Sequence, residues 1–380
     1  MLSRFWGVAL ALLATLSISV FLLYNHSGIL KGVTNFAQNL ISEGQFYAGA
    51  LYEEGRVVQQ DLVEAAKWYR LAAEQGHASA QHNLAIMFGN GTGVPQSFVK
   101  AAKWYRIAAE QGATDAQTNL GFMYASGQGV SQDFGEAVKW WRLASNNGEV
   151  AAHFNLAKMY ADGQGVIQDY SEAENLYLLA AEQGHAAAQT NLGAMYSDGK
   201  GVPQDYAEAR KWYLLAAEQG EAVAQTNLGK MYVAGQGVPQ SNAEAVKWWL
   251  LAAEQGEVDA QYVLAIMYYT GRGVPQSYLE AAVWFKMAAE QGHASAQHEL
   301  GMQYFEGKGV PQDFLSAEKW WLLSANQGDA SAQNNLGVLY ENGFGVEQDY
   351  KSAYLWYSRA EANGQAEAAE RRNRVAKHLL

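Results

Sequence analysis

A strict spacing of 36 residues constrains this chain more than any other feature of its sequence. Its prolines stand at positions 95, 203, 239, 275 and 311, separated by 36 residues or by a multiple of 36. A glycine that ends an AAEQG-like segment recurs with the same spacing, at Gly76, Gly112, Gly148, Gly184, Gly220, Gly256, Gly292, Gly328 and Gly364. A fixed period of this length is typical of repeat proteins, so the sequence predicts nine stacked units between residues 41 and 364.

The composition removes several classes of function. The chain has no cysteine, which excludes disulfides, thiolate nucleophiles and cysteine-ligated zinc. It carries 38 Asp and Glu residues against 26 Lys and Arg residues, a formal net charge of -12. Because nucleic-acid binding depends on a surplus of Lys and Arg that neutralises phosphates, we expect no nucleic-acid partner.

Each unit begins with a pattern that predicts one amphipathic helix. In the unit from residue 77 to residue 112, apolar side chains recur at the i, i+4, i+7, i+8 spacing of a helix, at Ala80, Leu84, Met87 and Phe88. Gly91 then supplies a position of positive φ, and Pro95 holds the residue before it extended. The chain is therefore expected to turn at this point rather than to continue helically.

A second helix follows the turn in every unit. Good N-cap residues stand at its start, at Asp61, Ser97, Asp133, Asp169, Asp205, Ser241, Ser277, Asp313 and Asp349. A glutamate three residues later, as in Asp133 with Glu136, predicts a capping box. A glutamine precedes every cap, at Gln60, Gln96, Gln132, Gln168, Gln204, Gln240, Gln276, Gln312 and Gln348, and its amide is expected to bond to the loop backbone.

Two helices of about a dozen residues cannot enclose a core alone, so each pair must bury its aromatic face on its neighbours. The sequence therefore predicts an all-α solenoid of helix-turn-helix units. A glycine recurs in the middle of the first helix, at Gly121, Gly193, Gly229, Gly301 and Gly337. Glycine at such a place costs roughly 0.5 to 1 kcal/mol relative to alanine, and a close approach of the two helices would offset that cost.

Units such as AQTNLGAMYSDGKGVPQDYAEARKWYLLAAEQG, residues 188–220, resemble Sel-one-like repeats, which are relatives of tetratricopeptide repeats. The pattern LGxMYxxGxGVxQD, the A-x-K-W-Y/W stretch and the final glycine carry the resemblance. It implies a right-handed superhelical α-solenoid of nine 36-residue repeats that mediates protein contacts, often in the bacterial envelope. Residues 365–380 are expected to form a polar C-terminal capping helix, because a solenoid needs its last stacking face covered.

The N-terminus carries an apolar stretch, residues 5–24, which is long enough to cross a membrane. We interpret residues 1–24 as a hydrophobic helix that acts as a transmembrane signal-anchor, followed by a linker over residues 25–40. A cleaved signal peptide, with Ser17 and Ser19 at its small-x-small site, is the alternative, and a buried core segment is a third. The anchor predicts a single-pass protein of the bacterial inner membrane with periplasmic repeats, whereas cleavage predicts a periplasmic or secreted protein.

Positions at which the units differ indicate where a partner could bind. Three positions of the first helix, spaced i, i+4 and i+7, vary together on one face. By the resemblance to tetratricopeptide arrays, this variable face lines the concave groove. The predicted partner-binding residues are Phe122, Phe154, Lys158, Lys230, Tyr262, Ile266, Tyr269, His298, Met302 and Phe305. A docking site for a protein or peptide is expected at Tyr262 to Phe305, although Tyr269 and Phe305 could instead cover their own helix ends.

A second variable stripe lies on the second helix. It changes from Arg70, Arg106 and Arg142 to Leu178, Leu214, Leu250 and Leu322. It is interpreted either as half-covered stacking positions or as a contact face. The oligomeric state is open, with a monomer expected.

The sequence gives little support for a catalytic function or a metal site. Ser97 with Lys100, and Ser316 with Lys319, match the serine-x-x-lysine motif of penicillin-interacting enzymes but lack its partner motifs. The histidines that share a repeat position are too far apart to bind one ion. We therefore expect no catalytic residue, metal or cofactor, and predict a non-enzymatic interaction scaffold. A penicillin-interacting cell-wall hydrolase and a secreted repeat effector remain the alternatives.

Overall fold

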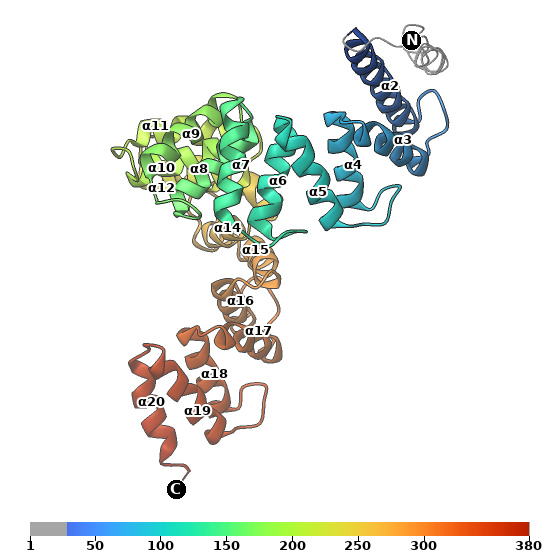
Figure 1. Ribbon diagram of the computed structural model, residues 1–380. Coiled ribbons are helices and arrows are strands. Elements are labelled where there is room, and N and C mark those ends of the chain that lie inside the picture. Colours follow the sequence, from blue (N-terminus) through green and yellow to red (C-terminus); the bar gives the residue numbers. More distant parts are fainter. Residues whose placement is uncertain (1–28, 380) are drawn as a thin grey trace. The chain divides into compact units, whose positions relative to one another are not determined.

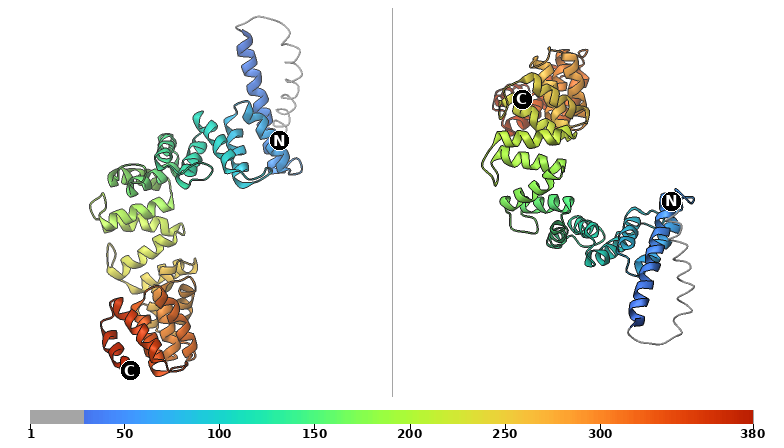
Figure 2. Two further views of the ribbon diagram at one scale, coloured as in Figure 1. Left: turned by 60° about the horizontal axis from the view of Figure 1, so that its bottom comes forward. Right: turned by 90° about the horizontal axis from the view of Figure 1, so that it is seen from above.

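The computed structural model describes residues 29–379, which form 19 α-helices and no strand (Figure 1). The chain divides into two compact units with a boundary after Gln183, and we describe each by itself. Within each unit, consecutive helices pack side by side in chain order, as Figure 2 shows. This packing confirms the predicted all-α solenoid of nine helix pairs. The predicted anchor, residues 1–24, lies outside the described residues.

Each repeat contributes a first and a second helix, and one further helix ends the chain. The first unit contains α2 (Ile29–Glu54), α3 (Leu62–Glu74), α4 (Ala78–Asn90), α5 (Phe98–Glu110), α6 (Thr114–Ser126), α7 (Phe134–Asn146), α8 (Val150–Asp162) and α9 (Tyr170–Glu182). The second unit contains α10 (Ala186–Asp198), α11 (Tyr206–Glu218), α12 (Ala222–Ala234), α13 (Asn242–Glu254), α14 (Val258–Thr270), α15 (Tyr278–Glu290), α16 (Ala294–Glu306), α17 (Phe314–Asn326), α18 (Ala330–Asn342), α19 (Tyr350–Ala362) and α20 (Glu367–Ala376). None of the helices between residues 29 and 379 combines the length and the apolar character that a membrane crossing requires.

The predicted linker covers residues 25–40, of which the structure describes residues 29–40. Residues 29–40 are helical and continue without a break into the first helix of the first repeat, so that α2 is twice as long as the other first helices. No proline interrupts residues 29–54, and a helix that is already nucleated adds further residues at little cost. Ala37 in this extension is also buried.

The second helices begin at the predicted caps. All nine N-cap side chains accept a hydrogen bond from a backbone N–H of the first turn. The predicted capping boxes are incomplete, however. The backbone N–H of Asp133 donates to the carbonyl oxygen of Tyr124 at 2.9 Å, and Glu136 instead accepts from Lys139 at 3.2 Å. The preceding first helix already satisfies the cap N–H, which leaves the glutamate free to pair with the lysine.

The glutamine before each cap bonds to backbone as expected, but its partner lies at the end of the first helix and not in the loop. Its Nε2 donates to the carbonyl oxygen seven residues earlier in all nine repeats, over 2.7 to 2.9 Å, as in Gln132 to Ala125. That carbonyl belongs to the last turn of the first helix, where the helix supplies no partner of its own. The glutamine therefore closes the helix end and fixes the turn that follows.

Each helix pair meets at a small residue of the first helix. A Cβ atom added to Gly121 would lie 2.6 Å from Nε1 of Trp141, so only glycine fits beneath this indole ring. The same Nε1 donates to the carbonyl oxygen of Thr118 at 3.1 Å, one turn earlier on α6. The expected close approach of the two helices is confirmed. The close approach buries an aromatic ring and also gives the indole N–H a hydrogen-bond acceptor.

A ladder of buried glutamines links successive repeats. Nε2 of Gln81 donates to the carbonyl oxygen of Ala73 on the preceding second helix at 3.0 Å. Its Oε1 accepts from Nε2 of Gln111, at the end of the following second helix, at 2.7 Å. A buried amide that is satisfied on both sides fixes the register of stacking, because a slipped repeat would leave it without partners.

The final helix, α20, covers the end of the second unit as expected of a cap. Ala368 and Val375 are fully buried, and Arg374 donates twice to the carboxylate of Glu341, each time over 2.8 Å. Burial alone would raise the pKa of Glu341, but the bonds from Arg374 and Tyr357 prevail and lower that pKa. The carboxylate therefore stays ionised and tethers α20 to α18.

Candidate protein-binding face

The predicted partner-binding residues lie on the first helices of both units. Phe122 belongs to α6, and Phe154 and Lys158 belong to α8, all in the first unit. The remaining predicted residues lie in the second unit, on α12, α14 and α16: Lys230, Tyr262, Ile266, Tyr269, His298, Met302 and Phe305. The variable face therefore has one section in each unit, and the two sections differ in exposure.

The most exposed apolar residues of the variable face are in the first unit. Phe122 keeps 56% of its surface exposed, and Ile86 keeps 36% at the same position of the preceding repeat. Lys158 and Lys230, which occupy that position in later repeats, are also exposed. Ile86 was missed by the sequence analysis, although its alignment with Phe122 in the repeat pattern was a sufficient signal. An exposed phenylalanine in an otherwise regular array is the kind of residue that partners bury.

Two tyrosines of the variable face, Tyr262 and Tyr269 on α14, are half-buried and pack on neighbouring rings. The ring of Tyr262 stacks on that of His293, with centroids 4.5 Å apart, and lies 6.0 Å from that of Phe285. Tyr269 makes an edge contact with Tyr278 at 5.0 Å. Burial, and then the charge of Glu299, raises the pKa of Tyr262, so its hydroxyl is neutral at pH 7. Part of each ring therefore serves the packing of the repeats.

Two phenylalanines of the variable face also pack inside their unit. The ring of Phe305 lies 5.2 Å from that of Phe314, 5.3 Å from that of Trp321 and 5.5 Å from that of Phe344. Phe154 packs on Tyr177 with centroids 6.0 Å apart. Both phenylalanines are half-buried, so each presents one edge to solvent and covers its helix pair with the rest.

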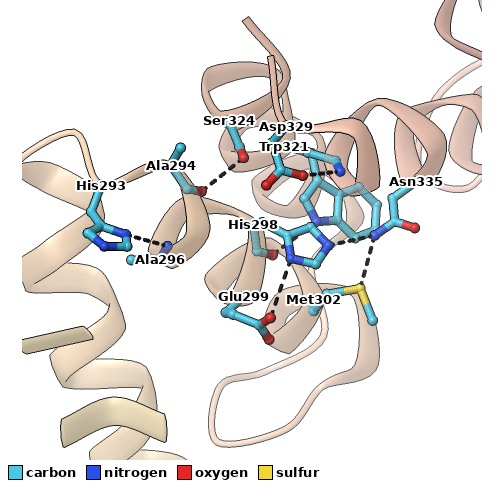
Figure 3. A network of polar contacts seen from close by, with 11 residues as sticks. His293, Ala294, Ala296, His298, Glu299, Met302, Trp321, Ser324, Asp329 and Asn335 are labelled. Atoms are coloured by element: carbon cyan, nitrogen blue, oxygen red, sulfur yellow. Dashed lines mark hydrogen bonds and ion pairs between the residues drawn. The ribbon is translucent and has the colours of Figure 1, made fainter. Parts of the chain in front are cut away.

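Figure 3 shows a polar network that joins the first helices of the last two repeats. Nδ2 of Asn335 lies 3.1 Å from Nε2 of His298 and 3.2 Å from Sδ of Met302. Nδ1 of the same imidazole lies 3.4 Å from the carboxylate of Glu299. The indole of Trp321 donates to the carbonyl oxygen of His298. Met302, whose side chain is half-buried, is thus held in place at this surface.

The same histidine and asparagine pair recurs in the first unit. Nε2 of His82 lies 3.1 Å from Nδ2 of Asn119 on the next first helix. Burial lowers the pKa of His82, which keeps the imidazole neutral at pH 7 and able to accept. Ile86 lies on α4 one turn after His82, and Phe122 lies on α6 one turn after Asn119, so both stand on a fixed framework.

The serines of both serine-x-x-lysine motifs have structural partners. Oγ of Ser97 caps α5 by accepting from the backbone N–H of Lys100 at 3.4 Å. Oγ of Ser316 donates to the carboxylate of Asp313 at 2.6 Å, a bond that lowers the pKa of Asp313. Lys319 lies over the ring of Trp320. In neither motif does the structure give the serine oxygen a bond to the side-chain amine.

Residues 29–379 contain no group of three or more metal-ligating side chains close enough to hold an ion.

The leucine stripe of the second helices lies at stacking positions. Leu214, Leu250 and Leu322 are half-buried against the cores of their repeats. In the earlier repeats, Arg142 is exposed and donates to the hydroxyl of Tyr160 at 2.7 Å.

The stacked helix pairs define an α-solenoid repeat protein. Nine consecutive segments match the Sel1 repeat, at residues 42–77, 78–112, 114–149, 150–185, 186–221, 222–257, 258–293, 294–329 and 330–365. The chain belongs to the Sel1 repeat family, whose members generally mediate protein–protein interactions and are typically non-enzymatic.

Two solved structures are similar over most of their length. A Sel1 repeat protein from Oxalobacter formigenes is 33% identical, with a TM-score of 0.66 over 84% of this chain and 92% of that one. A protective antigen of uropathogenic Escherichia coli that displays an SLR fold is also 33% identical, with a TM-score of 0.54 over 89% of this chain and 88% of that one. No curated protein matches the chain.

Proposed function

We propose that this chain is a non-enzymatic scaffold that binds a protein or peptide partner on its variable face. The observation that carries the proposal is the exposure of Phe122 and of Ile86, which holds the same position in the preceding repeat. The corresponding positions elsewhere hold lysine, alanine, valine or half-buried aliphatic residues, so the surface changes from repeat to repeat while the core does not. A scaffold needs this combination, because a constant core holds the repeats together and a variable surface selects the partner.

The two sections of the face would contribute differently. In the first unit, Ile86 and Phe122 offer apolar anchors beside the polar pair of His82 and Asn119. In the second unit, the half-buried Ile266, held by the repeat core, offers a flatter apolar surface. A partner bound to the first-unit section would bury Phe122 deeply, and one bound to the second-unit section would bury Ile266 less, because Ile266 has less surface left to lose.

The test is charge substitution on the face against a matched substitution off it. Phe122→Glu, Ile266→Glu and Met302→Glu are expected to reduce recovery of the partner in pull-downs from the bacterial envelope. Leu143→Glu is the control, because Leu143 is a similarly exposed apolar residue, at 41%, but lies on the second helix α7. Undiminished recovery by Phe122→Glu with intact helicity, or equal loss with Leu143→Glu, would contradict the proposal.

We also propose that the scaffold is displayed on the periplasmic side of a bacterial inner membrane. The apolar residues 5–24 and the preceding Arg4 support this assignment. N-terminal sequencing of the mature protein is expected to begin at or near Met1. A start after Ser19 would indicate a cleaved signal and favour the secreted effector. Covalent labelling of Ser97 or Ser316 by a penicillin probe would favour the hydrolase instead.

A further inference from the structure

Three successive repeats of the first unit place an exposed side chain at one position of the variable face. Ile86 on α4 and Phe122 on α6 keep 36% and 56% of their surfaces exposed, and the exposed Lys158 follows on α8. The three residues share one position of the 36-residue repeat, so they form a row across the three first helices, which we call the anchor row. Its order is two apolar side chains and then a cation.

The charge of Lys158 is unmatched within the described part of the chain. Among residues 29–379, no carboxylate forms an ion pair with Lys158, whereas Lys139 on the neighbouring helix α7 pairs with Glu136 at 3.2 Å. Charged groups of two partners are arranged so that opposite signs meet. A single cation at the end of two exposed apolar side chains therefore favours a ligand that carries two apolar side chains and a carboxylate in the same order.

The surface beside the anchor row has room for the backbone of such a ligand. The turn after each anchor carries a small, partly exposed residue, namely Gly89, Ala125 and Ala161. A Cβ atom added to Gly89 would meet no heavy atom within 4 Å, so the space next to Ile86 is open. The same position holds Tyr269 and Phe305 in the second unit, so this room is a property of the first unit.

The spacing of the anchors selects the conformation of the ligand. Nε2 of His82 and Nδ2 of Asn119 lie 3.1 Å apart, so α4 and α6 pack side by side. The axes of packed helices lie about 8 to 10 Å apart. A polyproline II segment rises about 3.1 Å per residue with three residues per turn, so its side chains recur on one face about every 9 Å. In a β-strand they recur about every 6.6 Å, which is too short.

We propose that the anchor row binds a polyproline II segment of a partner protein, in which two apolar side chains and a carboxylate stand three residues apart. The apolar side chains contact Ile86 and Phe122, and the carboxylate pairs with Lys158. The backbone of such a segment has no internal hydrogen bonds. It is therefore free to bond to Asn119 and Asn155, which precede Phe122 and Lys158 by one turn. The inference rests on the proposed docking function of the variable face and adds the chemistry of the partner.

The first test measures the fluorescence anisotropy of labelled peptides with the purified full-length protein in detergent micelles. The matched peptide is Leu-Pro-Pro-Leu-Pro-Pro-Glu, and its reverse is also tested because the anchors fix the order of side chains but not the chain direction. The peptide Leu-Pro-Leu-Pro-Glu-Pro-Pro, of equal composition, is expected to bind about fivefold more weakly or less, because it cannot reach all three anchors. A helical peptide with the same side chains seven residues apart represents the competing conformation. No saturable binding of the matched peptide in either direction, or tighter binding of one of the other two, would overturn the inference.

The second test exchanges charges between protein and peptide. Lys158→Glu is expected to weaken binding of the matched peptide by about fivefold or more, because repulsion replaces attraction. A peptide with lysine in place of its glutamate is expected to recover the affinity for this variant. Lys103→Glu is the control, since Lys103 is exposed on the second helix α5 of the same unit, and it should leave the affinity unchanged. Equal loss in both variants, or no recovery with the lysine peptide, would overturn the inference.

Failure of this inference can be distinguished from failure of the docking function. If Phe122→Glu reduces recovery of the envelope partner but the matched peptide does not bind, the variable face docks a partner of another conformation and only the inference falls. If the matched peptide binds with equal affinity to Phe122→Glu and to the wild type, it binds outside the anchor row and the inference also falls. If Phe122→Glu changes neither recovery nor peptide binding, both proposals are wrong.

Discussion

Gly121 and Trp141 provide the sharpest test of how each helix pair closes. In Gly121→Ala, the new methyl group would lie 2.6 Å from Nε1 of Trp141, far inside contact distance. The indole is only 2% exposed and cannot move outward without opening the core. If it moves, its N–H loses the carbonyl oxygen of Thr118. Alanine in a helix would otherwise be an improvement over glycine, so the sign of the effect is informative.

The expected magnitude follows from three contributions. Overpacking of a core costs about 1 to 3 kcal/mol. Leaving the buried indole N–H unpaired costs about 1 to 3 kcal/mol more. Alanine returns about 0.5 to 1 kcal/mol of helix propensity. We therefore expect Gly121→Ala to lower the free energy of unfolding by about 3 kcal/mol, measured by denaturant unfolding followed by circular dichroism.

A double-mutant cycle separates this clash from a general loss of stability. Two other repeats of the first unit place alanine opposite tyrosine, at Ala85 with Tyr105 and at Ala157 with Tyr177. The variant Gly121→Ala/Trp141→Tyr should therefore be more stable than the sum of its single changes by about 1 kcal/mol or more. Additive effects, or a Gly121→Ala protein as stable as the wild type, would refute the account of the helix contact.

Three further changes test buried polar groups. Gln303→Met should stabilise the second unit by about 1 kcal/mol, measured by denaturant unfolding, because it removes a buried amide oxygen with no partner; a less stable variant would contradict this. Asn147→Gln should stabilise the first unit by a similar amount by supplying the partner that the orphaned Oε1 of Gln117 lacks, and an unchanged unfolding midpoint would count against it. Burial lowers the pKa of His153, so its contribution to stability is complete above the ordinary histidine pKa and is lost as the pH falls below it. His153→Gln should flatten the fall in melting temperature on acidification, and an unchanged slope would exclude His153 as the cause.

The regular part of the fold could be predicted because it depends on local signals. The period, the caps and the glycine turns each act within one repeat, and the glutamine at positions such as Gln132 reaches a carbonyl only seven residues away. The role of Gly121 could be predicted because a glycine in mid-helix costs stability, and close contact with a side chain of the second helix is what offsets that cost. Every repeat carries the same local signals, so one interpretation applies to all nine repeats.

The remaining features depend on contacts that no single repeat reveals. The helical extension over residues 29–40 lacks the repeat pattern, so the repeat signals do not predict it. The capping boxes failed because Tyr124, on the previous helix, already accepts the cap N–H. On the variable face, Tyr262 and Phe122 have similar sequence signals, but Tyr262 stacks on His293 of the next repeat whereas Phe122 remains exposed. Exposure of a variable residue depends on what the neighbouring repeat places beside it.

Site-specific photo-crosslinking in living cells tests the central claim most directly. A photoreactive phenylalanine analogue at position 122 should give a discrete adduct with one partner protein, identified by mass spectrometry. The same analogue at position 143, on the opposite helix of that repeat and similarly exposed, should not give this adduct. Adducts of equal yield at both positions, or none at position 122, would contradict the assignment of the variable face as the docking surface.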